Sequence, residues 1–227
     1  MKFCNNLLKS IHYIRKNGVL SLTVLILRII FFSFYQTKFN TSSGLYLGRG
    51  FFVTGKRNIY LGSNFRAGVG LRLEAISEYG EQYFSPSIKI GKNVTFNDYI
   101  HIGCVDSIEI GDNVLLASKI FISDHNHGYY SGDESSLHQS PEIPPADRNL
   151  SYSPVCIEEN VWIGEFVSIL PGSHIGRGSV IGANSVVNGR IPEYSIAVGS
   201  PACVVKTYDF SKKQWRPLDS YEKEKLE

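Results

Sequence analysis

Two histidines separated by one residue, His125 and His127, stand at the start of a polar stretch of the sequence. Imidazole titrates close to neutral pH, so either histidine could act as a general base. Residues i and i+2 of a strand face the same side, so the pair could instead bind a metal ion, with His101 as a third ligand. The plainest alternative is that both histidines are polar groups on a surface loop.

The elements that must position these histidines are set by a repeat with a period of six residues. An aliphatic residue followed by glycine or another small residue recurs at this interval, most continuously from Ile157 to Asn188. A small or β-branched residue follows each key position by four residues, as Val161 follows Ile157. An amphipathic helix needs a period of about 3.6 residues, so the pattern excludes one. It fits short strands that each end in a corner, where Gly or Asn relieves the backbone.

Three such strands close one coil of about eighteen residues, and coils stack at the strand spacing of about 4.8 Å. The key aliphatic side chain points inward, so each coil buries apolar surface against the next. The repeat therefore predicts an all-β solenoid, a triangular prism of roughly seven coils. We assign residues 41–206 to this domain, with one long inserted loop at 123–154, where the period is lost. A loop of this length in a compact fold is more often functional than idle.

A carboxylate is the usual partner that orients a histidine base. Asp124 is the nearest one in sequence to the two loop histidines. Glu74 and Asp98 are further candidates, because both fall on adjacent coils. All three carboxylates therefore remain candidates. No serine or cysteine stands at a fixed spacing from a second residue that would make it a nucleophile.

The overall composition narrows the class of protein. The 227 residues carry 23 Lys and Arg against 21 Asp and Glu, a net charge of +2, so no basic excess marks a nucleic-acid-binding surface. Hydrophobic residues make up 43% of the chain, enough for a sizeable core. The four cysteines are scattered without a CxxC pair, which predicts free thiols in a reducing compartment and no thiolate zinc cluster.

The first forty residues differ in character from the repeat. Residues 19–35 read VLSLTVLILRIIFFSFY and follow four basic residues, with Asn17-Gly18 as a break between two short helices. A membrane-spanning helix needs about 20 apolar residues, and Arg28 near the middle is costly there. A secretory signal fits the charge and hydropathy but lacks a small-x-small cleavage site. We assign residues 1–40 to a helical segment that either caps the solenoid or lies on a membrane surface.

The repeated pattern [LIV]-G-x-x-[STAV]-x resembles that of the hexapeptide-repeat acyltransferases. The resemblance covers roughly Leu61 to Lys206 and is strongest to the galactoside, maltose and lipopolysaccharide O-acetyltransferases. It implies that the solenoid is a left-handed parallel β-helix and that the protein is a homotrimer. It further implies that acetyl-coenzyme A (acetyl-CoA) binds as a co-substrate between neighbouring prisms, with no metal ion.

The resemblance also implies catalytic residues. An ungapped match that starts at residues 110–114, IGDNV, places the family's catalytic histidine on His127, and a small gap would place it on His125. The string DHNHG around them is typical of polysaccharide O-acetyltransferases. The histidine would take the proton from a sugar hydroxyl while that oxygen attacks the thioester carbonyl. A family Asn on the substrate side falls on Asn97, which as a corner residue could equally stabilise a turn.

Residues 160–164, NVWIG, match the family segment that lines the thioester and pantetheine groove. Trp162 also fits an outward aromatic residue at a trimer contact. Ala183 matches a small residue whose backbone meets the pantetheine arm, and Lys206 matches a basic residue that meets the coenzyme phosphates, although two nearby lysines could serve as well. The implied cofactor-binding residues are Trp162, Gly164, Ala183 and Lys206.

We therefore expect an acetyl-CoA-dependent O-acetyltransferase that acts on a sugar hydroxyl of a bacterial surface polysaccharide, O-antigen or capsule. Its acceptor would be a sugar or a lipid-linked glycan, met by Asn97, Asp124 and the aromatic face of Tyr129. The enzyme would work in the cytoplasm, and a basic and apolar N-terminus favours a peripheral contact with the inner face of the membrane.

Two alternatives belong to other classes. The first is a zinc enzyme similar to the γ-class carbonic anhydrases, which use histidines on the same fold but at a wider spacing than His125 and His127. The second is a non-catalytic β-helix that serves in assembly. At the end of the chain, residues 207–227 are charge-rich with one aromatic anchor, Trp215, and we expect a short helix or a tail from Tyr208 onward.

Overall fold

The computed structural model describes residues 44–130 and 140–218, the backbone of Asn40–Thr41, and the isolated positions Gly18, Thr23, Val24 and Leu27. The chain divides into two units, Met1–Lys38 and Phe39–Glu227. Apart from the isolated positions, the N-terminal helical segment expected at 1–40 lies outside the described residues and stays a prediction. In the part of the chain that is described, no helix is long and apolar enough to cross a membrane.

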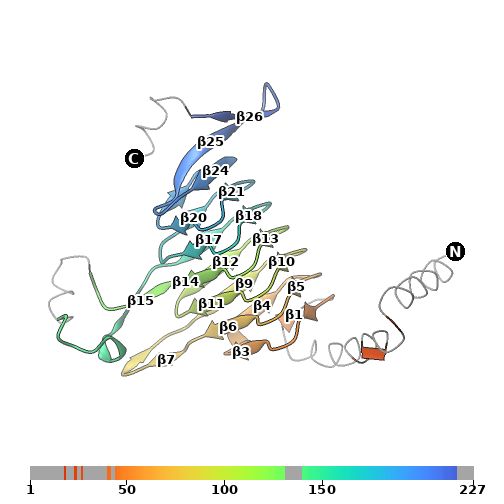
Figure 1. Cartoon of the computed structure of the whole chain (residues 1–227). Helices are drawn as coiled ribbons and strands as arrows, with labels where there is room; N and C mark the ends of the chain where they lie inside the picture. The colour runs from red at the N-terminus through yellow and green to blue at the C-terminus, as the bar shows by residue number, and fades with distance from the viewer. Residues whose placement is uncertain are drawn as a thin grey trace. The chain divides into compact units, whose positions relative to one another are not determined.

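Three parallel sheets form the sides of a solenoid in the second unit (Figure 1). Sheet A contains, in spatial order, β1 (Asn40–Thr41), β4 (Ile59–Leu61), β9 (Ser87–Ile90), β12 (Ser107–Ile110), β17 (Val155–Ile157), β20 (His174–Ile175) and β23 (Arg190–Ile191). Sheet B begins with the parallel strands β2 (Tyr46–Leu47), β5 (Arg66–Ala67), β10 (Thr95–Phe96), β13 (Leu115–Leu116), β18 (Trp162–Ile163), β21 (Val180–Ile181) and β24 (Ser195–Val198). Sheet C contains β3 (Phe52–Thr54), β6 (Arg72–Ala75), β11 (His101–Cys104), β14 (Phe121–Ser123), β19 (Ser168–Ile169) and β22 (Val186–Val187).

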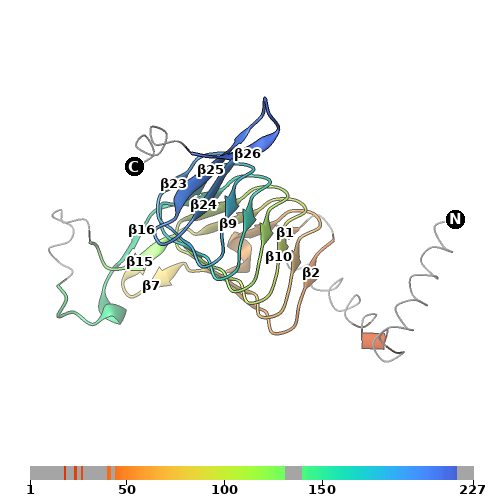
Figure 2. The same ribbon diagram turned by 45° about the horizontal axis from the view of Figure 1, so that its top comes forward.

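Consecutive strands of the chain pass from sheet A to sheet B to sheet C and back, one coil at a time, as Figure 2 shows from a second direction. One short 3-10 turn, η1 (Lys56–Asn58), precedes β4. The all-β solenoid predicted from the six-residue period is therefore confirmed, and its three parallel sheets agree with a left-handed β-helix.

Aliphatic side chains of successive coils lie above one another inside the prism. In sheet C, Ile102 pairs in register with Ile122, which pairs in turn with Ile169. All three are fully buried, whereas the strand neighbours His101 and Phe121 point outward and are partly exposed. Because burying one such side chain stabilises a fold by about 1.5–3 kcal/mol, this inward stack accounts for much of the cohesion between coils.

Asparagines turn the corner from sheet A to sheet B. Asn64, Asn93, Asn113 and Asn160 have positive φ angles between 56° and 61°, a region that Asn tolerates better than most residues. Their side chains also bond to one another along the corner, from Asn64 to Asn93 (3.0 Å), from Asn93 to Asn113 (3.1 Å) and from Asn113 to Asn160 (3.2 Å). The Asn positions of the repeat thus serve both the turn and the contact between coils.

Within the described residues, two excursions leave the prism. The first is the predicted loop, in which β15 (His125–His127) and β16 (Leu150–Tyr152) pair antiparallel, with the 3-10 turn η3 (Pro145–Asp147) before β16. We call residues 124–153 the arm; residues 131–139 within it are not described. The second excursion is a short hairpin of β7 (Glu78–Tyr79) and β8 (Gln82–Tyr83), which the sequence interpretation missed. Figure 1 shows β7 and β15 on the same side of the solenoid.

The end of the chain differs from expectation. In place of a helix or tail from Tyr208 onward, β25 (Cys203–Asp209) and β26 (Gln214–Pro217) extend sheet B as an antiparallel hairpin. The ring centroids of Tyr208 and Trp215 lie 5.2 Å apart across this hairpin. Aromatic pairs across neighbouring strands stabilise a sheet. This contact favours a hairpin over the helix or tail that was predicted from the charge-rich sequence. Residues 219–227 lie outside the described part of the chain.

Asp124 anchors the point where the arm leaves the prism. Its fully buried carboxylate accepts hydrogen bonds from the backbone N–H groups of Val105 (2.9 Å) and Asp106 (2.8 Å). Burial alone raises the pKa of Asp124, but these bonds and one from His125 outweigh it, so the pKa lies below its usual value. Burial and the nearby Asp124 charge raise the pKa of the Cys104 thiol, which therefore stays protonated.

Leu115 and Leu116 provide a matched test of the inward stack, because they are adjacent on β13 and face opposite sides. Leu116 is 0% exposed and Leu115 is 41% exposed. Leu116→Ala should lower the free energy of unfolding by about 2–5 kcal/mol, since it opens a cavity. Leu115→Ala should cost less than about 1 kcal/mol. Urea unfolding followed by circular dichroism measures both, and equal losses would contradict the stack.

Asp124 should make part of the stability depend on pH. A carboxyl group whose folded pKa lies below its unfolded value stabilises the fold above about pH 4, and this contribution fades as the pH falls toward the folded pKa. Asp124→Asn should therefore cost about 1–3 kcal/mol near neutral pH. The difference from wild type should shrink below about pH 4, where the wild-type carboxyl takes up a proton. Urea unfolding of wild type and Asp124→Asn, at neutral pH and below about pH 4, checks this. A difference in unfolding free energy that does not change with pH would show that Asp124 is not an anion in the fold.

Candidate active site

His125 is held by the carboxylate at the base of the arm. Its Nδ1 lies 2.9 Å from Asp124 Oδ1 and 3.3 Å from the hydroxyl of Ser123. Because Asp124 is ionised, Nδ1 carries a proton and donates a hydrogen bond to the carboxylate, so that in the neutral ring the lone pair lies on Nε2. The ring sits over Gly103, where a Cβ atom would come within 3.2 Å of Cε1. The His125 side chain is only 13% exposed, so access to its Nε2 is narrow.

His127 is held by a different element. Its Nδ1 lies 3.1 Å from the hydroxyl oxygen of Tyr79 on β7, and the two ring centroids are 5.2 Å apart in an edge-on contact. The Tyr79 hydroxyl donates its proton to the backbone carbonyl of Ala146 at 2.6 Å. The His127 side chain lies on β15 in an exposed position, unlike His125. The structure thus presents two imidazoles, one held by an anion and one held by a phenol.

Hydrogen bonds among other described residues link the two sides of the arm. Tyr129 follows His127 by two residues and is half-buried. The neighbouring Tyr130 donates a hydrogen bond to the His127 carbonyl (2.5 Å) and accepts one from Arg148 (3.0 Å). Arg148 also reaches the carbonyl of Ile143 (2.9 Å). Tyr130 thus connects the strand of the histidines to Arg148 on the other side of the arm.

The other candidate carboxylates have different partners. Glu74 accepts hydrogen bonds from His101 Nε2 (2.9 Å) and from Arg72 (2.6 Å), which together outweigh burial and lower its pKa. Asp98 accepts a hydrogen bond from the backbone N–H of Val69 (2.7 Å), which joins the corners between sheets B and C of two adjacent coils. The structure therefore assigns Glu74 to His101 and Asp98 to a contact between coils, and neither to a loop histidine. Among the described residues, no three His, Cys, Asp or Glu side chains are grouped as a metal site.

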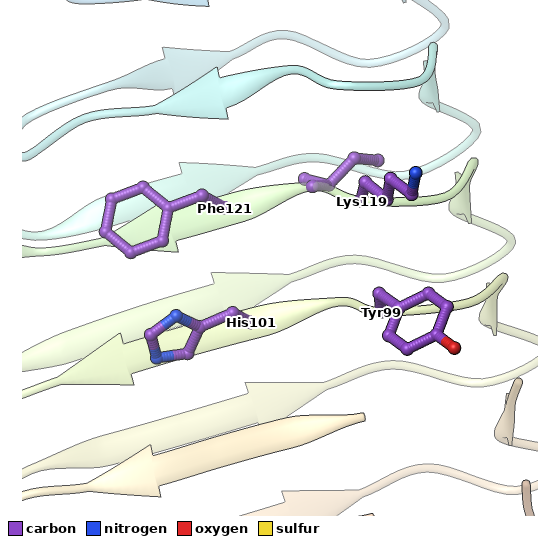
Figure 3. Close-up of a pocket in the computed structure, with 5 residues that line it drawn as sticks. Tyr99, His101, Lys119 and Phe121 are labelled. Atoms are coloured by element: carbon purple, nitrogen blue, oxygen red, sulfur yellow. The ribbon is translucent and has the colours of Figure 1, made fainter. Parts of the chain in front are cut away.

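A hollow of about 550 Å³ lies on the outer face of sheet C, lined by Tyr99, His101, Lys119, Ile120 and Phe121 (Figure 3). His101 and Phe121 point outward from adjacent strands, with ring centroids 5.3 Å apart. The hollow occupies the side of the prism that separates the arm from the corner between sheets B and C.

The predicted substrate-side Asn97 and the predicted cofactor residues gather elsewhere. Asn97, Gly164 and Ala183 occupy the turns that lead from sheet B to sheet C on three coils. A Cβ atom on Gly164 would come within 2.6 Å of the Ala183 backbone nitrogen, so this close stack requires glycine. Trp162 points outward from β18 beside this corner and is 51% exposed, and the exposed Lys206 lies on β25.

Within one chain, the two halves of the predicted site therefore lie apart. The arm with His127 emerges at the corner between sheets C and A, whereas Gly164 and Ala183 lie at the corner between sheets B and C. A strand of sheet C, about 10 Å long for three residues, intervenes. The residues predicted together from the sequence are thus brought into two separate groups.

The β7–β8 hairpin contacts the arm, and sequence interpretation missed it. Tyr79 of this hairpin contacts His127. Gln82 forms two hydrogen bonds with the backbone of Leu150 in the arm (2.6 Å and 3.2 Å). The six-residue period is lost between residues 76 and 87 as well as in the long loop, and this second gap was the signal that could have found it.

The sequence is similar to those of known acetyltransferases. Residues 157–189 match the family described as bacterial transferase hexapeptide (six repeats). Over 164 residues the chain is 44% identical to WbbJ of Escherichia coli (strain K12), provisionally named a lipopolysaccharide biosynthesis O-acetyl transferase; the match spans 72% of this chain and 79% of WbbJ. It is also 38% identical over 127 residues to the galactoside O-acetyltransferase of the same strain, covering 55% of this chain and 57% of that enzyme.

Among solved structures, AntD, an N-acyltransferase from Bacillus cereus in complex with dTDP and 3-hydroxybutyryl-CoA, superimposes with a TM-score of 0.61. The match covers 79% of this chain and 89% of AntD at 21% identity, which shows a shared fold. The repeat, the three parallel sheets and the extent of the likeness to WbbJ agree. The chain belongs to the hexapeptide-repeat acetyltransferase family and is an O-acetyltransferase.

Proposed function

We propose that this O-acetyltransferase transfers the acetyl group of acetyl-CoA to a hydroxyl of a sugar, in the assembly of a bacterial surface polysaccharide such as O-antigen or capsule. The single observation that carries the proposal is an exposed imidazole on the arm, that of His127, whose Nδ1 is held by the hydroxyl of Tyr79. The likeness to WbbJ supports the polysaccharide acceptor, and the likeness to galactoside O-acetyltransferase supports a sugar.

In the proposed reaction, His127 is the general base. Its Nε2 takes the proton of the sugar hydroxyl while the oxygen forms a bond to the acetyl carbonyl carbon. The carbon–sulfur bond then breaks, and the imidazolium returns the proton to the departing thiolate, so that coenzyme A leaves as a thiol. His127 ranks ahead of His125 because a base must reach the acceptor, and His125 is 13% exposed. Tyr129 is proposed to contact the acceptor. The predicted contact of Asp124 with the acceptor is wrong, because its carboxylate is 0% exposed and is bonded to His125 and to backbone N–H groups.

The coenzyme is proposed to lie along the corner between sheets B and C. Gly164 and Ala183 leave little side-chain bulk there, so a narrow chain such as pantetheine can approach the backbone. Trp162 flanks the corner with an exposed ring, and Lys206 offers a charge to the phosphates. Asn97 lies on the same corner, two coils before Gly164.

We further propose that the active site is completed between two copies of the chain in a homotrimer. The support is geometric, because the base and the coenzyme corner of one chain lie on different edges of the prism. Rotation about a threefold axis would bring the arm of one copy to the coenzyme corner of the next. We place the enzyme in the cytoplasm, with residues 1–40 as a peripheral contact to the membrane on which lipid-linked glycans are assembled.

His127→Ala should lower the turnover number by at least about 100-fold, the usual contribution of a general base. The assay is thiol release from acetyl-CoA with a panel of sugar acceptors. His125→Ala is the matched comparison and should retain most of the activity. A loss confined to His125→Ala would transfer the role of base to His125, and full activity in both variants would remove histidine from the mechanism. Stoichiometric zinc in the purified protein would instead favour a metal enzyme.

Complementation tests whether the site spans two copies. His127→Ala removes the base, and Ala183→Phe should block the coenzyme corner without disturbing the fold, because Ala183 is exposed. Each variant alone should be inactive. Mixed trimers assembled by co-expression should recover about a quarter of wild-type activity, since that share of interfaces pairs an intact arm with an intact corner. Mixed trimers as inactive as the single variants would show that both groups act within one chain.

A further inference from the structure

The contact between Tyr79 and His127 determines which nitrogen of His127 carries a proton. A phenol has one proton to donate, and that of Tyr79 goes to the Ala146 carbonyl at 2.6 Å. The 3.1 Å contact from Tyr79 to His127 Nδ1 can then be a hydrogen bond only if Nδ1 is the donor. Neutral imidazole has one N–H, so the lone pair of His127 falls on Nε2.

The hairpin that carries Tyr79 is itself fixed against the arm. The amide of Gln82 accepts a hydrogen bond from the Leu150 backbone N–H (2.6 Å) and donates one to the Leu150 carbonyl (3.2 Å). Leu150 is buried and pairs with His127 across the antiparallel strands of the arm. Two residues of one short hairpin therefore hold the arm, one through the backbone and one through the imidazole.

We propose that Tyr79 is a positioning residue for catalysis, which orients the His127 ring and keeps its proton on Nδ1 so that Nε2 is free to accept the proton of the acceptor hydroxyl. The consequence for turnover rests on the proposed role of His127 as the base, whereas the consequence for the tautomer does not. The arrangement does with a neutral phenol what Asp124 does for His125 with a carboxylate.

The arrangement has a chemical consequence for the reaction. A phenol accepts the Nδ1–H bond without placing a full negative charge beside the ring, whereas a carboxylate stabilises the imidazolium form. Tyr79 can therefore fix the geometry of His127 without an anionic partner, and the Ala146 carbonyl keeps the phenol oriented in turn. Ala146 belongs to η3 of the arm, so the position of η3 determines the position of the phenol that holds the base.

Tyr79→Phe removes the hydroxyl and preserves the ring, so the edge-on contact with His127 is kept. Long-range ¹⁵N–¹H correlation spectra of the protein report the protonated nitrogen of each histidine, and the His127 signals are identified by their loss in His127→Gln. Wild type should show Nδ1–H for His127, and Tyr79→Phe should show a mixture of both tautomers. The turnover number should fall about tenfold, with the KM for acetyl-CoA unchanged.

Tyr83→Phe is the matched control, because Tyr83 lies on the same hairpin and is 78% exposed. It should leave both the tautomer and the turnover number as in wild type. An unchanged His127 tautomer in Tyr79→Phe, or an unchanged turnover number, would overturn the positioning role. Full activity of His127→Ala would instead refute the proposed base, and the tautomer measurement would still decide whether Tyr79 controls the ring.

Discussion

The rest of this structure depends on the stacking of aliphatic side chains between successive coils. These side chains recur at six-residue intervals along the chain, once on each side of the prism. Ile102, Ile122 and Ile169 illustrate it, each fully buried beneath the same position of the next coil. The inward positions are committed to this stack, so chemistry is left to outward positions, corners and insertions. The arm and the β7–β8 hairpin are insertions of this kind, and they contact each other through Gln82 and Leu150.

The same constraint explains why the site is divided. A coil has three corners, and one side of the prism separates any two of them. An insertion at one corner could reach a second corner only by crossing the outer face of the sheet between those two corners. The arm leaves at Asp124, after sheet C, while the stack of Gly164 on Ala183 needs the close approach found between sheets B and C. A prism of this kind can join two corners by packing copies side by side, which makes oligomerisation a natural part of the proposed mechanism.

Much of the fold could be predicted from the sequence because its repeat is local. A six-residue period needs no knowledge of distant contacts, and the inserted loop was visible as a loss of that period. The contacts that support the site are not local. Asp124 directly precedes His125, and neighbouring side chains of a regular strand point to opposite faces, which would separate the two. They nevertheless form a hydrogen bond, because Asp124 lies just before β15, where the arm leaves the prism. The partner of His127, Tyr79, is 48 residues away.

The C-terminal end of the repeat was the least predictable. The hairpin of β25 and β26 closes sheet B with antiparallel strands whose aromatic contacts, such as Tyr208 with Trp215, follow no six-residue rule. Charge-rich sequence there suggested a helix or tail, and packing on the last coil decided otherwise. Local pattern thus predicts the scaffold well and the elements that close or decorate it poorly.

A crystal structure of the protein with bound coenzyme A tests the central claim most directly. The account predicts that the pantetheine arm follows the corner formed by Gly164 and Ala183 of one copy, and that its sulfur ends beside the Nε2 atom of His127 from a neighbouring copy. A coenzyme whose sulfur lies far from every histidine of the arm, or that binds wholly within one copy, would contradict it.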